Sequence, residues 1–146
     1  MGFLEQDLAY TAGLVDGEGC ILITKWTQQR DPNTSPAAQY RLKVQVTNCD
    51  PEICYWLKDT FTKFTGCVSV HVPLKPWKTR YVWAVTGKKA SKFLEVILPF
   101  LKVKRPQALL AIDYQNKKSL QGLTSRNTTW LEEQRKQMHQ LNKRGR

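Results

Sequence analysis

The chain lacks the features that mark secreted and membrane proteins. Its 146 residues include no apolar run of membrane-spanning length, and the N-terminal segment has neither a basic region nor the apolar stretch of a signal peptide. Gln6 does not meet the Ser/Thr requirement for N-myristoylation. We therefore expect an intracellular protein with no membrane partner, located in the cytoplasm or nucleoid, or in an organelle such as a mitochondrion or chloroplast.

Cysteine and histidine patterns typical of structural metal sites are also missing. Cys20, Cys49, Cys54 and Cys67 contain no C-x-x-C pair, and the chain has only two histidines. Without such spacing, a zinc site is not expected. In an intracellular protein the four thiols are expected to be reduced and mostly buried.

Acidic residues are scarce relative to basic ones. The chain has 23 Lys and Arg residues against 12 Asp and Glu residues, a formal net charge of +11. This excess favours a polyanionic partner, and nucleic acid is favoured over an anionic membrane because no strongly basic amphipathic helix stands out. With 41% hydrophobic residues, the chain can build one core, so we expect a single domain over residues 1–146.

Hydrophobic periodicity and turn residues predict an α+β fold. In the second strand, Tyr40, Leu42, Val44 and Val46 alternate with polar and basic residues, which predicts one buried face and one polar face. The pattern leaves the phases of the first and fourth strands open. The predicted elements are a helix within 8–19, strands over 20–30 and 40–47, a helix over 51–64, strands over 68–72 and 80–86, and helices over 89–101, 106–118 and about 128–142. The last of these helices is indicated by a capping box, Thr129-Trp130-Leu131-Glu132. The order αββαββα with additional C-terminal helices implies a four-stranded antiparallel sheet with helices on one face.

One short stretch carries the strongest functional signal. Between residues 8 and 19, Ala9, Gly13 and Gly17 are four residues apart and line one stripe of a helix, where a second backbone can approach closely. The stretch ends with Glu18, beside carbonyl groups that a helix C-terminus leaves unpaired. A carboxylate next to free carbonyls is a ligand set for a hard divalent cation.

Residues 11–19, TAGLVDGEG, resemble the signature of the LAGLIDADG homing endonucleases, with five of nine letters identical. The resemblance implies an αββαββα core over about residues 5–120, with a curved sheet that lies on DNA. Because the motif occurs once, the chain resembles the single-motif members, which act as homodimers. The dimer interface implied for this chain comprises Ala9, Ala12, Gly13, Asp16 and Gly17. A symmetric dimer implies a nearly palindromic target of roughly 20 bp.

The resemblance also implies metal-assisted hydrolysis of phosphodiester bonds. Glu18 and the carbonyl of Gly17 match the metal ligands, with Mg²⁺ or Mn²⁺ as the cofactor and Ca²⁺ expected to bind without supporting cleavage. Asn48 matches a polar residue that orders water near the metals, and Lys104 matches a lysine that organises solvent. The residues alone leave alternatives open: Glu18 as a solvated helix-terminal acid, Asn48 as a turn former before Asp50, and Lys104 as a solvated or phosphate-facing cation.

The polar faces of the predicted strands supply side chains that can reach base edges and phosphates in the major groove. For the first strand, the resemblance supplies the phase that the pattern leaves open. A plain solvated sheet face is the alternative for the second strand. The expected DNA-binding residues are Thr24, Trp26, Gln28, Gln39, Arg41, Lys43, Gln45, Ser69, His71 and Arg80.

The sequence therefore predicts a sequence-specific homing endonuclease that cuts both strands of double-stranded DNA and supports the mobility of its intron or intein. The alternatives are an intron RNA maturase, or a non-cleaving DNA-binding protein on the same fold. A basic structural RNA-binding protein would explain the charge but would leave the glycine-lined helix unexplained.

Overall fold

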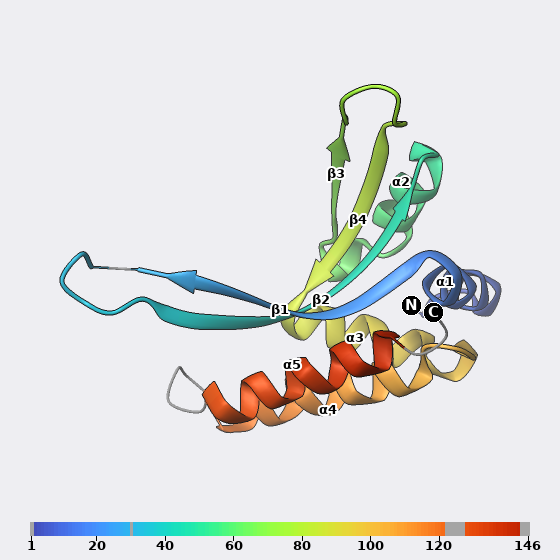
Figure 1. Cartoon of the computed structure of the whole chain (residues 1–146). Coiled ribbons are helices and arrows are strands. Elements are labelled where there is room, and N and C mark those ends of the chain that lie inside the picture. Colours follow the sequence, from blue (N-terminus) through green and yellow to red (C-terminus); the bar gives the residue numbers. More distant parts are fainter. Residues whose placement is uncertain (1, 30, 122–127, 144–146) are drawn as a thin grey trace.

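The computed structural model describes residues 2–29, 31–121 and 128–143 (Figure 1). The order of elements confirms the α+β prediction. The elements are α1 (Glu5–Glu18), β1 (Gly19–Gln28), β2 (Ala37–Asn48), α2 (Pro51–Thr60), η1 (Thr62–Phe64), β3 (Cys67–His71), β4 (Arg80–Thr86), α3 (Gly87–Ile97), η2 (Leu98–Phe100), α4 (Arg105–Gln121) and α5 (Thr128–Lys143). Two predicted helices end earlier than expected, because each closes in a separate 3₁₀ turn, and in the second case Pro99 cannot continue the α-helical hydrogen bonding. None of the described helices is long and apolar enough to cross a bilayer.

The four strands form one antiparallel sheet in the order β1-β2-β4-β3. The register pairs Thr24 with Arg41 and Gln45 with Ala84, and on the other edge it pairs Ser69 with Val82. These six residues, together with every second residue from each of them along its strand, share one face, which we call the open face. The helices cover the opposite face, and the β1–β2 and β3–β4 hairpins diverge, so that the sheet is strongly curved (Figure 1).

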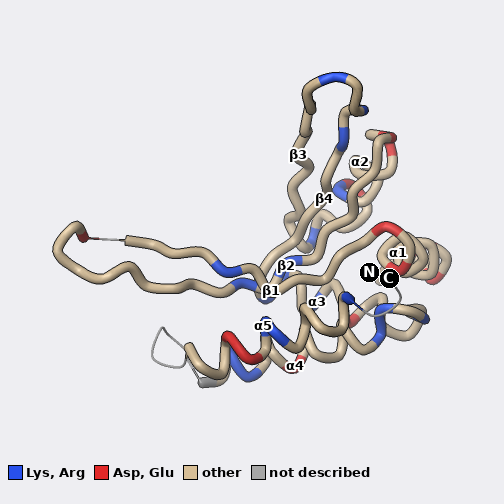
Figure 2. Tube along the Cα trace, in the orientation of Figure 1, with Lys and Arg blue, Asp and Glu red and all other residues tan. Residues whose placement is uncertain are grey.

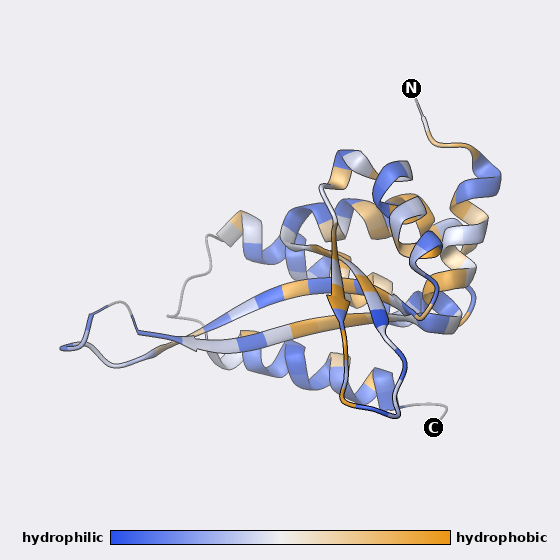
Figure 3. Ribbon diagram, turned by 90° about the horizontal axis from the view of Figure 1, so that it is seen from above, coloured by the Kyte–Doolittle hydropathy of each residue, from blue (hydrophilic) through white to orange (hydrophobic). Residues whose placement is uncertain are grey.

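The helix-covered face of the sheet holds the core. The predicted buried set of β2, which includes Leu42 and Val44, is confirmed, and each such side chain contributes roughly 1.5–3 kcal/mol through burial. The phase of β4 is now settled: Trp83 and Val85 are buried, whereas Val82 and Ala84 face the open side. Orange segments concentrate where the sheet meets the helices, and the outer part of the β1–β2 hairpin is mostly hydrophilic (Figure 3).

The junction between α1 and β1 depends on a glycine. The backbone N–H of Gly19 donates to the carbonyl of Val15, which closes the helix. A Cβ added at Gly19 would lie 2.6 Å from Val15 Cα and 2.7 Å from Val15 O, so no other residue fits without moving the backbone. This close approach places Glu18 at the point where the helix turns directly into the sheet.

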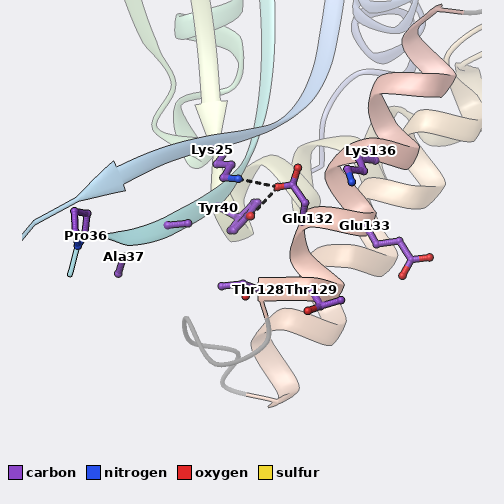
Figure 4. A pocket seen from close by; sticks show the side chains of 10 residues that line it. Lys25, Pro36, Ala37, Tyr40, Thr128, Thr129, Glu132, Glu133 and Lys136 are labelled. Carbon is purple, nitrogen blue, oxygen red and sulfur yellow. Dashed lines mark hydrogen bonds and ion pairs between the residues drawn. The ribbon is translucent and has the colours of Figure 1, made fainter.

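The C-terminal helices brace the β1–β2 hairpin from below. Glu132 of α5 accepts a hydrogen bond from the Tyr40 hydroxyl at 2.7 Å and pairs with Lys25 at 3.2 Å, at the wall of a cavity of about 810 Å³ (Figure 4). Hydrogen bonds from Arg135 and Tyr40 lower the pKa of Glu132 to about 2. The predicted capping box was wrong, because α5 begins at Thr128 and the Glu132 carboxylate bonds to these tertiary partners.

Side chains from both helices also bind backbone groups of the hairpin. Lys118 of α4 donates to the carbonyl of Tyr40, and Asn142 of α5 donates to the carbonyl of Ile21 at 3.0 Å. These carbonyls lie on strand segments that have a neighbouring strand on one side only. The helical layer therefore satisfies these two edge carbonyls and ties the helices to the hairpin.

Candidate functional site

Two of the predicted catalytic side chains meet at the C-terminus of α1. Asn48 donates its amide N–H to the Glu18 carboxylate at 2.5 Å, and its own carbonyl accepts the backbone N–H of Asp50 at 2.8 Å. The carboxylate of Asp50 in turn caps α2 at the N–H of Glu52, as its sequence position predicts. Asn48 thus forms the turn, as one of its two interpretations predicts, and also binds the Glu18 carboxylate, whereas its role in ordering water near metal ions stays a prediction.

Asp16 brings the third predicted residue, Lys104, to the same place. The Asp16 carboxylate accepts backbone N–H groups of Lys102 and Lys104 at 2.8 Å and of Val103 at 3.2 Å. The ammonium group of Lys104 returns to the carbonyl of Asp16 at 2.6 Å. The linker before α4 is therefore tied to the last turn of α1, two residues from Glu18. The Asp16 carboxylate is committed to its own chain, and its place in a dimer interface stays a prediction.

A shallow depression of about 410 Å³ lies beside Glu18 and Asn48. Glu18 and Asn48 line it together with Thr47, Cys49 and Arg80. Sequence reasoning assigned Arg80 to DNA binding alone and missed Thr47 and Cys49. The signal lies in the strand pairing, since Asn48 lies opposite Tyr81 and this places Arg80 beside the end of β2.

Every side chain expected to contact DNA lies on the open face. Thr24 pairs with Arg41 and Trp26 with Gln39, and His71 pairs with Arg80 on the other hairpin. The guanidinium of Arg41 lies over the Trp26 ring, 4.9 Å from its centroid, an arrangement that holds the charged group away from the core. Lys and Arg residues occur along the β1–β2 hairpin and at the end of the β3–β4 hairpin (Figure 2).

Less polar side chains interrupt this face, and among them Cys20 faces the side that the resemblance implies. Val82, Ala84 and the cysteine side chains of Cys20 and Cys67 lie among the polar residues. The expectation that the cysteines are mostly buried was wrong: only Cys54 is buried, Cys20 is half-buried, and Cys49 and Cys67 are exposed. Short alternating strands place thiols outward as readily as inward.

The small-residue stripe of α1 is exposed. Ala9, Gly13 and Gly17 face outward, and a Cβ built on either glycine meets no atom within 4 Å. Ala12 was wrongly included in this surface, because it is fully buried with Val15 in the core of its own chain. The exposed surface of α1 next to Glu18 is therefore lined by backbone and by the small residues of the stripe.

The oxygen donors at the end of α1 fit a hard divalent cation only in part. The Glu18 carboxylate and the carbonyl of Gly17, which lies in the last helical turn, are the ligand types that Mg²⁺ and Ca²⁺ prefer. Within the described parts of the chain, no group of three His, Cys, Asp or Glu side chains converges on one point. The described part of one chain therefore offers two oxygen ligand groups at this point, fewer than the six or more that Mg²⁺ and Ca²⁺ take.

The comparison with known families assigns the chain to a class. A family model described as LAGLIDADG endonuclease matches residues 11–121, and the chain belongs to this family. Among solved structures it is similar to the homing endonuclease I-CvuI, with a TM-score of 0.69 and 22% identity over 97% of this chain and 85% of that one.

The archaeal intron-encoded homing endonuclease I-Vdi141I has the same fold, with a TM-score of 0.74 and 17% identity over 97% of this chain and 87% of that one. For I-GzeII, the TM-score is 0.56 and the identity is 17%, and the match covers only 36% of that longer chain. A search of curated protein sequences found no match. The likeness in length to I-CvuI and I-Vdi141I agrees with the single copy of the motif.

Proposed function

We propose that this protein is a metal-dependent, homodimeric homing endonuclease that cuts both strands of a long, pseudo-palindromic DNA site. The observation that carries the proposal is the hydrogen bond from Asn48 to Glu18 beside the open face, with Lys104 tied to the same helix end. An exposed acid at a helix C-terminus opposes the helix dipole. Held in one orientation by Asn48, it is suited to bind a cation.

DNA binding is supported by the form and charge of the open face. A curved antiparallel sheet fits the major groove, where Arg, Lys and Gln side chains distinguish bases by their hydrogen-bonding edges. Arg41, Lys43 and Gln45 supply these types along β2. I-CvuI and I-Vdi141I, which share the fold, were both solved in complex with DNA.

Dimer formation is supported by the incomplete site and by the exposed stripe. Each chain offers one Glu18, and two strands require two cutting sites. A two-fold axis along the stripe of Ala9, Gly13 and Gly17 would bring two such helices together and place the two Glu18 residues near each other. Symmetry would then impose a pseudo-palindromic target.

The residues of the site have separate roles in hydrolysis. A bound divalent ion, Mg²⁺ or Mn²⁺, supplies charge neutralisation at the phosphate and lowers the pKa of an attacking water, whereas Ca²⁺ is proposed to bind without supporting the reaction. Glu18 and the Gly17 carbonyl would hold the ion, and Asn48 fixes the carboxylate. Lys104 adds positive charge behind the helix end. Arg80 lines the depression and is placed to bind a phosphate oxygen and offset its charge.

The experiment that tests this function is a selection of cleaved molecules from a randomised duplex library in the presence of Mg²⁺. The proposal predicts double-strand cuts within a symmetric recognition sequence. Binding without cutting would instead identify a DNA-binding protein that has lost catalysis. If neither occurs while an intron RNA is bound, the maturase alternative replaces the proposal.

A further inference from the structure

The loop that joins β3 to β4, residues 72–79, exposes large apolar side chains that the fold does not use. Leu74 is 90% exposed, and Val72 and Trp77 are each 77% exposed. We call this segment the Trp77 loop. Large apolar side chains that gather on one exposed segment mark a contact surface, because leaving them in water is unfavourable when a partner can cover them.

The charged residues of the Trp77 loop and of the chain segment around it are all basic. Lys75, Lys78 and Arg80 lie in or next to the loop, and no acidic residue occurs between Asp59 and Glu95 in the sequence. In Figure 2 the end of the β3–β4 hairpin carries only Lys and Arg among charged residues. Apolar side chains flanked by Lys and Arg are complementary to a nucleic acid, in which sugars and bases are bordered by phosphates.

The Trp77 loop also adjoins the proposed cleavage site. A groove of about 630 Å³ is lined by Cys49, Pro73, Pro76, Trp77, Lys78 and Arg80. Two of these residues, Cys49 and Arg80, also line the depression that contains Glu18 and Asn48. The groove and the depression therefore adjoin each other at Cys49 and Arg80, and an extended ligand bound at Glu18 can continue along Trp77.

We propose that the Trp77 loop docks on the target duplex beside the cut phosphodiester bond and determines which base pairs are accepted at the centre of the site. Trp77 and Leu74 pack against deoxyribose and base edges, and Lys78 and Arg80 hold the adjacent phosphates. Apolar side chains that insert into a groove of the DNA favour base steps that deform easily. The loop would therefore select central base pairs through the shape of the DNA. This inference rests on the proposed endonuclease function.

The test repeats the randomised-library selection with the wild type, Trp77→Ala and Trp77→Phe. Leu120→Ala is the matched control, because Leu120 is 87% exposed on α4 and lies outside the groove. We expect Trp77→Ala to lose base preference between the two cut positions while keeping it at the outer positions, and to bind the preferred site roughly 10-fold more weakly. Trp77→Phe, which keeps an aromatic ring, should restore most of both properties.

Selected sites for Trp77→Ala that match those of the wild type and of Leu120→Ala would overturn the inference while leaving the endonuclease function standing. A wild type that cuts no library member would overturn both. Trp77 is mostly exposed, so its truncation removes little packing. Leu74→Ala supplies an independent readout, and unchanged central preference in that variant as well would exclude the loop from DNA recognition.

Discussion

Replacing Gly13 with leucine separates the stability of one chain from the stability of the proposed dimer. Within one chain, a side chain at Gly13 meets no atom within 4 Å. Leucine is a better helix former than glycine by roughly 0.7 kcal/mol, so a lone folded chain should become slightly more stable. The same leucine at a helix-to-helix interface would hold the two backbones apart.

The effect on association can be estimated from symmetry. In a two-fold interface each substitution appears twice, and overpacking costs about 1–3 kcal/mol per site, so the dimer should lose about 2–6 kcal/mol. This corresponds to association weakened by about 30-fold to more than 10,000-fold. Sedimentation velocity across a range of protein concentrations measures this shift, and thermal unfolding of the dilute protein measures the stability of the single chain.

Gly2→Leu is the control for simply adding an exposed leucine, because Gly2 also has no neighbouring atom within 4 Å and lies outside α1. Gly2→Leu should remain dimeric. An unchanged dimer for Gly13→Leu would refute the interface along the stripe. A chain that is monomeric before any substitution would do the same.

Two further substitutions test the structural account. Gly19→Ala should destabilise the protein by roughly 1–3 kcal/mol in chemical denaturation, because the added Cβ meets backbone atoms of Val15, and unchanged stability would show that the α1–β1 junction can relax. The pKa of Glu132 falls from 4.5 to about 2 on folding, so its contribution is present above pH 4.5 and is lost as the pH drops towards 2. Glu132→Gln should therefore remove about 1 kcal/mol of stability at neutral pH and flatten the loss of stability between pH 5 and pH 2, and a pH profile identical to that of the wild type would contradict the brace on Tyr40.

The sequence predicted the elements whose local signals agree with the tertiary structure. Strict alternation in β2 identified its buried face, and the Asp50-Pro51 pair located the start of α2. The phase of the first strand, meaning which of its side chains face the open side, followed from the resemblance, since its own pattern was ambiguous. Only the buried face of β2 followed from periodicity, because the start of α2 depended on a local capping pair.

Long-range contacts account for what the sequence did not reveal. In β4, the large side chains of Tyr81, Val82 and Trp83 are consecutive, so only packing against the helices could fix the phase. The proximity of Arg80 to Glu18 depends on strand pairing. The local sequence predicted that Glu132 caps a helix. Its carboxylate instead accepts hydrogen bonds from Tyr40 and Arg135, because the tertiary structure brings the Tyr40 hydroxyl to it.

The most direct test of the central claim is the cleavage of a selected duplex by Glu18→Gln in the presence of Mg²⁺. The substitution keeps the size of the side chain and removes the charge that a divalent ion requires. Binding of the duplex, measured in parallel, should stay within a few-fold of the wild type, while cutting of both strands should be lost. Cutting by Glu18→Gln at the wild-type rate would remove Glu18 from the reaction and contradict the account.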